Sequence, residues 1–86
     1  MAYTVELTAR AARDLRAIPR PDQVRIARRL DGLAENPRPY GVRKLEGEED
    51  LSRIRVGDFR VIYTVLDRRL VVLVIRVGHR RDVYRS

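Results

Sequence analysis

The sequence contains no cysteine, no tryptophan and a single histidine, His79. Without cysteine, disulfide bonds and thiolate metal sites are excluded, and one histidine cannot build a histidine cluster. We therefore expect neither a metal ion nor another cofactor. No apolar run approaches the roughly 20 residues of a membrane helix, and the first segment is charged where a leader peptide would be apolar. These absences together predict a cytoplasmic protein without a membrane partner.

What is present is charge, and it is mostly arginine. The chain has 86 residues, of which 44% are hydrophobic and 36% charged, as expected for one globular domain spanning residues 1–86. Lysine occurs once, at Lys44, and the formal net charge is +7. Residues 53–86 hold nine arginines and three aspartates, whereas residues 1–52 are nearly balanced. A basic field confined to one region favours a polyanionic partner. Nucleic acid and an anionic membrane surface are both candidates by charge, and of the two we expect nucleic acid.

Hydrophobic periodicity changes from a helical to a strand pattern along the chain. Tyr3–Leu7 alternates like a strand, and Thr8 is a candidate N-cap for a helix over Ala9–Ile18. A second helix spans Pro21–Glu35 and ends at Asn36-Pro37. A short edge strand, an acidic loop and three longer strands follow, at Val42–Leu45, Glu46–Asp50, Ser52–Val56, Phe59–Leu66 and Leu70–Val77. This order predicts an α+β fold, in which the N-terminal strand and a helical hairpin pack on a twisted, mainly antiparallel sheet.

The clearest functional signal is a predicted hairpin that brings arginines together. Gly57-Asp58 between two alternating runs predicts a type II′ turn. A two-residue turn pairs Arg55 with Arg60 and places Arg53 diagonally on the same face. Like charges opposed across a sheet are destabilising, so the trio predicts a site for an anion. A three-residue turn would break this pairing and weaken the inference.

The last two strands extend the predicted cluster. A three-residue turn at Asp67–Arg69 would pair Tyr63 with Leu73 and Arg60 with Arg76. The helices would then cover an apolar face formed by Ile54, Val56, Phe59, Val61, Tyr63, Val65, Val71, Leu73, Ile75 and Val77. The opposite face would carry the arginines, although a single strand arginine such as Arg76 is more often a solvated surface residue.

The segment after the last strand would bring further polar groups to this face. If residues 79–84 form a helical turn, Arg80 and Tyr84 lie four residues apart on one side. Guanidinium groups bind phosphate oxygens, and an exposed tyrosine stacks on an unpaired base. His79 and Arg81 would lie at the edge of the cluster, although a lone histidine is more often a hydrogen-bonded surface residue. The combination favours single-stranded RNA over duplex DNA.

Short motifs follow one another in a characteristic order along the chain. They are an initial Tyr-x-Val, Ala-x-x-Asp-Leu, Asn-Pro, Lys44-Leu45-x-Gly47, the stretch 53–63 and Val77-Gly-His-Arg-Arg-Asp-Val-Tyr84. The ordered set resembles the RelE/ParE superfamily of bacterial type II toxins. The resemblance implies a β-α-α-then-antiparallel fold and a cognate antitoxin as partner in a hetero-oligomer. RelE-like members cleave mRNA in the ribosomal A site, whereas ParE-like members poison DNA gyrase.

The resemblance also implies a site and a reaction. A RelE-type active site carried onto this chain falls on Arg53, Arg55, Arg60, Arg80 and Tyr84. We expect catalysis from Arg55, Arg60, Arg80 and Tyr84, and RNA phosphate binding from Arg53, Arg76, His79 and Arg81. The ribose 2′-OH would attack the adjacent phosphorus without a metal ion. Relatives often carry lysine at positions 53 and 55, and because arginine keeps its proton, the general base is unassigned. The closing arginine and tyrosine favour the nuclease over the gyrase branch, and a non-catalytic RNA- or ribosome-binding module is the third alternative.

Overall fold

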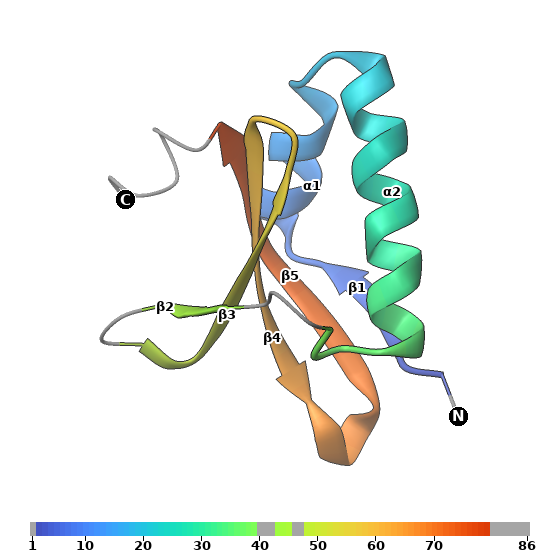
Figure 1. Ribbon diagram of the computed structural model, residues 1–86, viewed down its shortest axis with the longest axis vertical. Coiled ribbons are helices and arrows are strands. Elements are labelled where there is room, and N and C mark those ends of the chain that lie inside the picture. Colours follow the sequence, from blue (N-terminus) through green and yellow to red (C-terminus); the bar gives the residue numbers. More distant parts are fainter. Residues whose placement is uncertain (1, 40–42, 46–47, 80–86) are drawn as a thin grey trace.

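The chain folds as two helices on one five-stranded sheet, and the computed structural model describes residues 2–39, 43–45 and 48–79 (Figure 1). The elements are β1 (Thr4–Leu7), α1 (Ala9–Arg16), α2 (Arg20–Glu35), β2 (Arg43–Leu45), β3 (Glu48–Val56), β4 (Phe59–Leu66), a 3₁₀ turn at Asp67–Arg69 and β5 (Val71–His79). The strand order is β1-β5-β4-β3-β2, with β1 parallel to β5 and the other neighbours antiparallel. Both helices lie on one side of β4 and β5 (Figure 1). The predicted α+β architecture is confirmed.

Helix boundaries follow the capping residues and prolines of the sequence. The Thr8 hydroxyl accepts a hydrogen bond of 3.1 Å from the Ala11 backbone N–H, which confirms Thr8 as the N-cap of α1. Helix α1 ends at Arg16, two residues before the predicted Ile18. Helix α2 begins one residue before Pro21, which occupies the first turn, where a missing N–H costs no helical hydrogen bond.

The hydrophobic core lies between the helices and the sheet. Its buried members are Ala11, Ile26, Leu30, Leu33, Ile54, Val61, Tyr63, Val72, Val74 and Val77. Tyr63 is 0% exposed, which confirms its expected place in the core. Its hydroxyl donates a hydrogen bond of 2.8 Å to the Pro37 carbonyl and so ties the segment after α2 to β4. Among the described residues, no helix is long and apolar enough to cross a membrane.

The β3–β4 hairpin has the register that the sequence predicts. Val56 pairs with Phe59 across the turn, and Arg55 pairs with Arg60. Gly57 has a φ of 60°, and the only other residue with positive φ among those described is Leu70. A positive φ at the first central residue alone is the pattern of a type II′ turn, so the predicted turn is confirmed.

The predicted register of the last strand is wrong. The 3₁₀ turn is followed by Leu70 in the left-handed region, with a φ of 53°, so Leu66 pairs with Val71 rather than Leu70. This extra residue places Val72 and Val74 in the core, where Val71 and Leu73 were expected. An irregularity after Ile62 shifts the pairing again, and it restores Val77 to the core face.

Two further corrections concern the edges of the sheet. The predicted acidic loop over residues 46–50 is partly a strand, because β3 begins at Glu48; residues 46 and 47 lie outside the described residues. The short edge strand is confirmed over Arg43–Leu45, and it pairs with β3 through an irregular register at Lys44 and Leu45. The sheet therefore extends beyond the hairpin strands to β2.

Candidate functional site: an arginine face on the sheet

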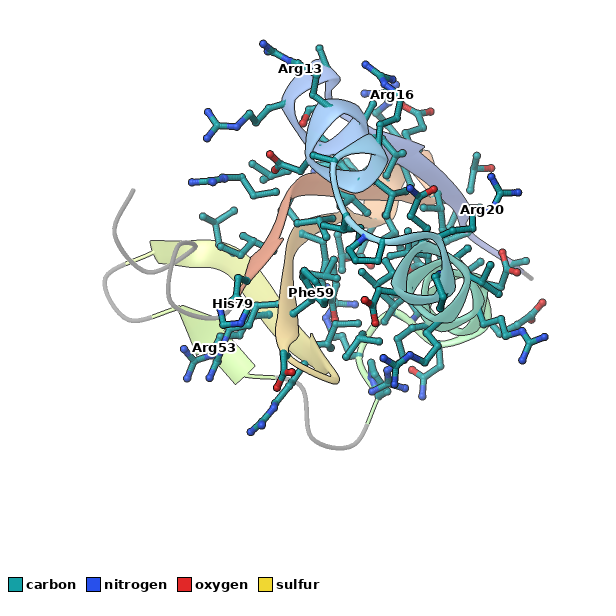
Figure 2. The ribbon with its side chains drawn as sticks, turned by 90° about the horizontal axis from the view of Figure 1, so that it is seen from above. Arg13, Arg16, Arg20, Arg53, Phe59 and His79 are labelled. Atoms are coloured by element: carbon teal, nitrogen blue, oxygen red, sulfur yellow. The ribbon has the colours of Figure 1, made fainter. Side chains whose placement is uncertain are left out.

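Four arginines from three neighbouring strands define the candidate site. They are Arg53 and Arg55 on β3, Arg60 on β4 and Arg76 on β5, and we call them the arginine face. Ile54 and Val61 alternate with the hairpin arginines and belong to the core under the helices. Successive strand residues point to opposite sides, so the hairpin arginines point away from the helices. Figure 2 shows Arg53 and His79 on one side of the strands, whereas Arg13, Arg16 and Arg20 project around the helices.

One row of the arginine face crosses Arg55, Arg60 and Gly78. Arg60 is paired with Arg55 on one side and with Gly78 on the other. Gly78 contributes no side chain beside the Arg60 guanidinium. Arg55 is exposed, and its Nε donates a hydrogen bond of 3.0 Å to the carbonyl of Gly57 in its own turn. This bond uses one of the five guanidinium N–H donors and holds the side chain toward the tip of the hairpin.

The neighbouring row crosses Arg53, Ile62 and Arg76. Ile62 is paired with both arginines and is only 6% exposed, although it lies on the side of β4 away from the helices. The apolar stems of long arginine side chains can cover a neighbour of this kind. The Nε atoms of Arg53, Arg60 and Arg76 are all shielded from solvent. Clustered guanidinium groups that are partly withdrawn from water favour an anion with several oxygens, such as a phosphate.

The expected pairing of Arg60 with Arg76 is wrong, because the shifted register of β5 places Arg76 opposite Ile62. Nor is Arg76 a solvated surface residue, since its side chain is only 17% exposed. Its Nε lies 3.7 Å from Oδ2 of Asp14, a carboxylate on α1. The same oxygen accepts a hydrogen bond of 3.0 Å from the Val77 backbone N–H. The motif Ala-x-x-Asp-Leu marks Asp14 in the sequence, but no linear pattern links α1 to the last strand.

His79 lies at the end of β5, next to the arginine face in sequence. It is exposed and pairs with Phe59, and the two rings meet edge to face with centroids 6.0 Å apart. A groove of about 320 Å³ lies beside this aromatic pair, lined also by Asp14, Ile18 and Val77 among others. The structure therefore brings His79 to the end of the strand that carries Arg76. Its predicted role in phosphate binding stays a prediction.

The remaining predicted site residues, Arg80, Arg81 and Tyr84, lie outside the described residues. Their roles stay predictions. Within the described part of the chain, no three histidine, cysteine, aspartate or glutamate side chains are grouped so that they could hold a metal ion. The functional groups that the described part of the site provides are therefore the guanidinium groups of its arginines.

A separate polar cluster lies at the other end of β4. The Arg38 guanidinium donates to both oxygens of Asp67, at 3.2 and 2.8 Å, and the Tyr3 hydroxyl donates to Oδ1 at 2.7 Å. These hydrogen bonds, with Arg38 contributing most, hold the pKa of the Asp67 carboxyl below its usual value. The bond to Asp67 raises the pKa of the Tyr3 phenol. The cluster joins three chain segments and belongs to the scaffold rather than to the arginine face.

Comparison with known proteins identifies the family. The model of the ParE toxin of the type II toxin–antitoxin system parDE matches residues 5–84. The chain belongs to this toxin family. It is 34% identical to toxin RelG of Mycobacterium tuberculosis H37Rv, over 99% of each chain. It is 32% identical to the mRNA interferase toxin RelE of Escherichia coli K12, over 98% of this chain and 92% of the relative.

Solved structures support the same family assignment. The fold matches the crystal structure of the intact E. coli RelBE toxin–antitoxin complex with a TM-score of 0.81 at 30% identity, over 91% of this chain and 96% of that chain. The expected resemblance to the RelE/ParE superfamily is therefore confirmed in both sequence and fold. The relatives span nearly the full length of the toxin, including the strands that carry the arginine face.

Proposed function

We propose that this toxin is a ribosome-dependent endoribonuclease that cleaves mRNA and thereby inhibits translation. The observation that carries the proposal is the arginine face, where Arg55 and Arg60 are cross-strand partners and Arg53 and Arg76 flank Ile62. The fold does not require like charges at these positions, and a phosphate backbone would compensate them. The E. coli relative named an mRNA interferase, at 32% identity, supports mRNA as the substrate.

The reaction that fits these groups is intramolecular transfer at phosphorus. The ribose 2′-OH attacks the adjacent phosphorus, the bond to the 5′-oxygen breaks, and the products carry a 2′,3′-cyclic phosphate and a free 5′-OH. Arg53, Arg55 and Arg60 stabilise the negative charge that develops on the equatorial oxygens. Guanidinium groups supply this stabilisation without a metal ion. They do not accept the 2′ proton, because an arginine stays protonated at neutral pH.

The residues beyond β5 complete the proposed site. Arg80 would stabilise or protonate the leaving 5′-oxygen, so that it departs as the 5′-OH, and Tyr84 would stack on the nucleotide and hold it for in-line attack. The 2′ proton needs an acceptor, and the candidates are His79, a water molecule or a group of the ribosome. His79 is exposed and is the last residue of β5, so it directly precedes Arg80 in the sequence.

Arg60→Ala tests the proposal against a matched control. Translating ribosomes programmed with a defined mRNA would be incubated with purified protein, and RNA 5′ and 3′ ends would be mapped. We expect the cleavage rate of Arg60→Ala to fall by about 10²-fold or more, the typical cost of one preorganised donor. Arg68→Ala removes the same side chain from an exposed position in the 3₁₀ turn, at the other end of β4. This control should cleave at the wild-type rate.

The family model favours a second candidate function, because it describes ParE toxins. A protein of that type would leave mRNA intact on translating ribosomes and would inhibit supercoiling by DNA gyrase. A non-catalytic binding module would protect an A-site codon in footprinting without producing cyclic phosphate ends. Either result, obtained with the wild-type protein, would replace nuclease activity as the function of the arginine face.

We also propose a cognate antitoxin as the partner in the cell, in a hetero-oligomeric complex. The matching solved structures include toxin–antitoxin complexes of E. coli and Pyrococcus horikoshii. An acidic segment of the antitoxin would complement the excess positive charge of the toxin. Growth arrest on expression of the toxin, relieved by co-expression of the neighbouring open reading frame, tests this partner.

A further inference from the structure

Asp14 lies where α1 meets the open edge of β5, and it contacts three groups. Its Oδ2 accepts the 3.0 Å hydrogen bond from the Val77 N–H and lies 3.7 Å from the Arg76 Nε. Its Oδ1 lies 3.3 Å from the Arg10 Nε. The Asp14 side chain is 14% exposed. This carboxylate is therefore ion-paired with Arg76, a member of the arginine face.

The topology of the sheet explains why β5 needs this contact. β1 pairs with β5 only as far as Val74, so within the described residues the outer edge of β5 has no strand partner beyond Val74. Side chains of α1 and of its N-cap residue form hydrogen bonds with the backbone of β5 there. The Thr8 hydroxyl donates a hydrogen bond of 3.0 Å to the Ile75 carbonyl, and Asp14 accepts from Val77. Backbone groups at an open edge need such partners, and here they also fix the course of the strand.

The Asp14 carboxylate also forms an ion pair with Arg76. Because 3.7 Å exceeds hydrogen-bond distance, the Arg76 Nε interacts with Asp14 through charge rather than through a bond. This Nε is shielded from solvent, so the interaction is screened less than a surface pair would be. Asp14 thus attracts the Arg76 guanidinium and partly offsets its positive charge.

We infer that Asp14 is a positioning residue, which fixes Arg76 and the end of β5 and lowers the positive charge that the arginine face presents to RNA. This inference rests on the proposed function, since it assigns RNA to that face. The inference predicts opposite changes in RNA binding and in catalysis. Removing a purely structural carboxylate would change both in the same direction. Removing the Asp14 charge should strengthen RNA binding while it weakens catalysis.

Asp14→Asn is the decisive variant, because the amide oxygen can still accept from the Val77 N–H while the charge is lost. Binding of a short single-stranded RNA oligonucleotide is measured by fluorescence anisotropy across a range of salt. We expect affinity to rise roughly fivefold at low salt, and the slope of log K against log salt to steepen by about 0.7, as for one added phosphate contact. The cleavage rate at saturating ribosomes should fall about tenfold, because Arg76 is no longer held in place.

Asp31→Asn is the matched control. Asp31 is exposed near the C-terminal end of α2, and its substitution changes the net charge by the same amount. It should leave both the salt slope and the cleavage rate at wild-type values. If Asp14→Asn lowers only the melting temperature and binds RNA as Asp31→Asn does, Asp14 is structural and the inference is wrong.

A double-mutant cycle tests whether Asp14 acts on RNA binding through Arg76. Arg76→Gln removes the charge that Asp14 is proposed to offset, so adding Asp14→Asn to it should not raise RNA affinity further. An equal increase in both backgrounds would overturn the inference. Absence of cleavage by the wild-type toxin would refute the proposed nuclease activity, but the binding measurements would still decide the role of Asp14.

Discussion

Replacing Tyr63 with phenylalanine should lower the free energy of unfolding, because it removes a buried hydrogen bond. The side chain is 0% exposed, and its hydroxyl donates a 2.8 Å hydrogen bond to the carbonyl of the buried Pro37. Tyr63→Phe keeps the ring and leaves that carbonyl without this donor. An unmade buried hydrogen bond costs about 1.5 kcal/mol, which corresponds to a fall in melting temperature of roughly 6–12 °C for a domain of this size.

The pH dependence of this difference gives a second, independent test. Burial raises the pKa of the Tyr63 phenol above its ordinary value of 10.0, although Arg29 and Arg38 partly counteract it. The unfolded chain therefore ionises first, and the wild type loses stability as the pH rises from 10.0 through the folded pKa. Tyr63→Phe lacks this loss. The difference in stability between the two proteins should thus be largest near neutral pH and shrink in alkaline solution.

Denaturation with urea, followed by far-ultraviolet circular dichroism at neutral and alkaline pH, measures both effects. Tyr3→Phe is the control, because its hydroxyl bonds the exposed Asp67 and its loss should leave the free energy of unfolding at neutral pH nearly unchanged. Equal stability of Tyr63→Phe and wild type at neutral pH would refute the reasoning about the Pro37 carbonyl. A difference that stays constant up to high pH would refute the reasoning about ionisation.

Two further predictions concern the scaffold. Thr8→Ala removes the N-cap bond from Ala11 and the bond to Ile75, so the unfolding free energy should fall by about 1–2 kcal/mol in urea denaturation, while Thr8→Ser should retain most of it. Asp67, whose pKa is lowered mainly by Arg38, stabilises the fold above its unfolded pKa of 3.8 and loses that contribution as the pH falls through the folded pKa. The difference in stability between wild type and Asp67→Asn should therefore vanish in acid, and a difference that persists there would contradict this assignment.

The hairpin could be predicted because its determinants are local. A glycine with positive φ selects the turn, and the turn fixes the register of Arg55 and Arg60. The register of β5 could not be predicted in the same way. It depends on Leu70 in a left-handed conformation, which leucine rarely adopts, and on the irregularity after Ile62. Neither feature has a sequence signal, and each shifts the strand by one residue.

The candidate site was predictable in its members more than in its arrangement. Arg53, Arg55 and Arg60 lie on one face as the alternation requires. Arg76 also reaches that face, but opposite Ile62 instead of Arg60, because the two one-residue shifts add up to two residues, which is the side-chain period of a strand. The structure added Asp14, which is distant from Arg76 in sequence and meets it only because β1 stops short of the end of β5.

The sequence by itself determined the fold class, the toxin family and the cluster of arginines on the hairpin, because periodicity, turn chemistry and motif order all act over a few residues. The tertiary structure decided which groups surround those arginines. It placed Ile62 between Arg53 and Arg76, and it brought the Asp14 carboxylate to the open edge of β5. Such contacts arise from the pairing of strands and the docking of α1, so their energies depend on segments that no local pattern connects.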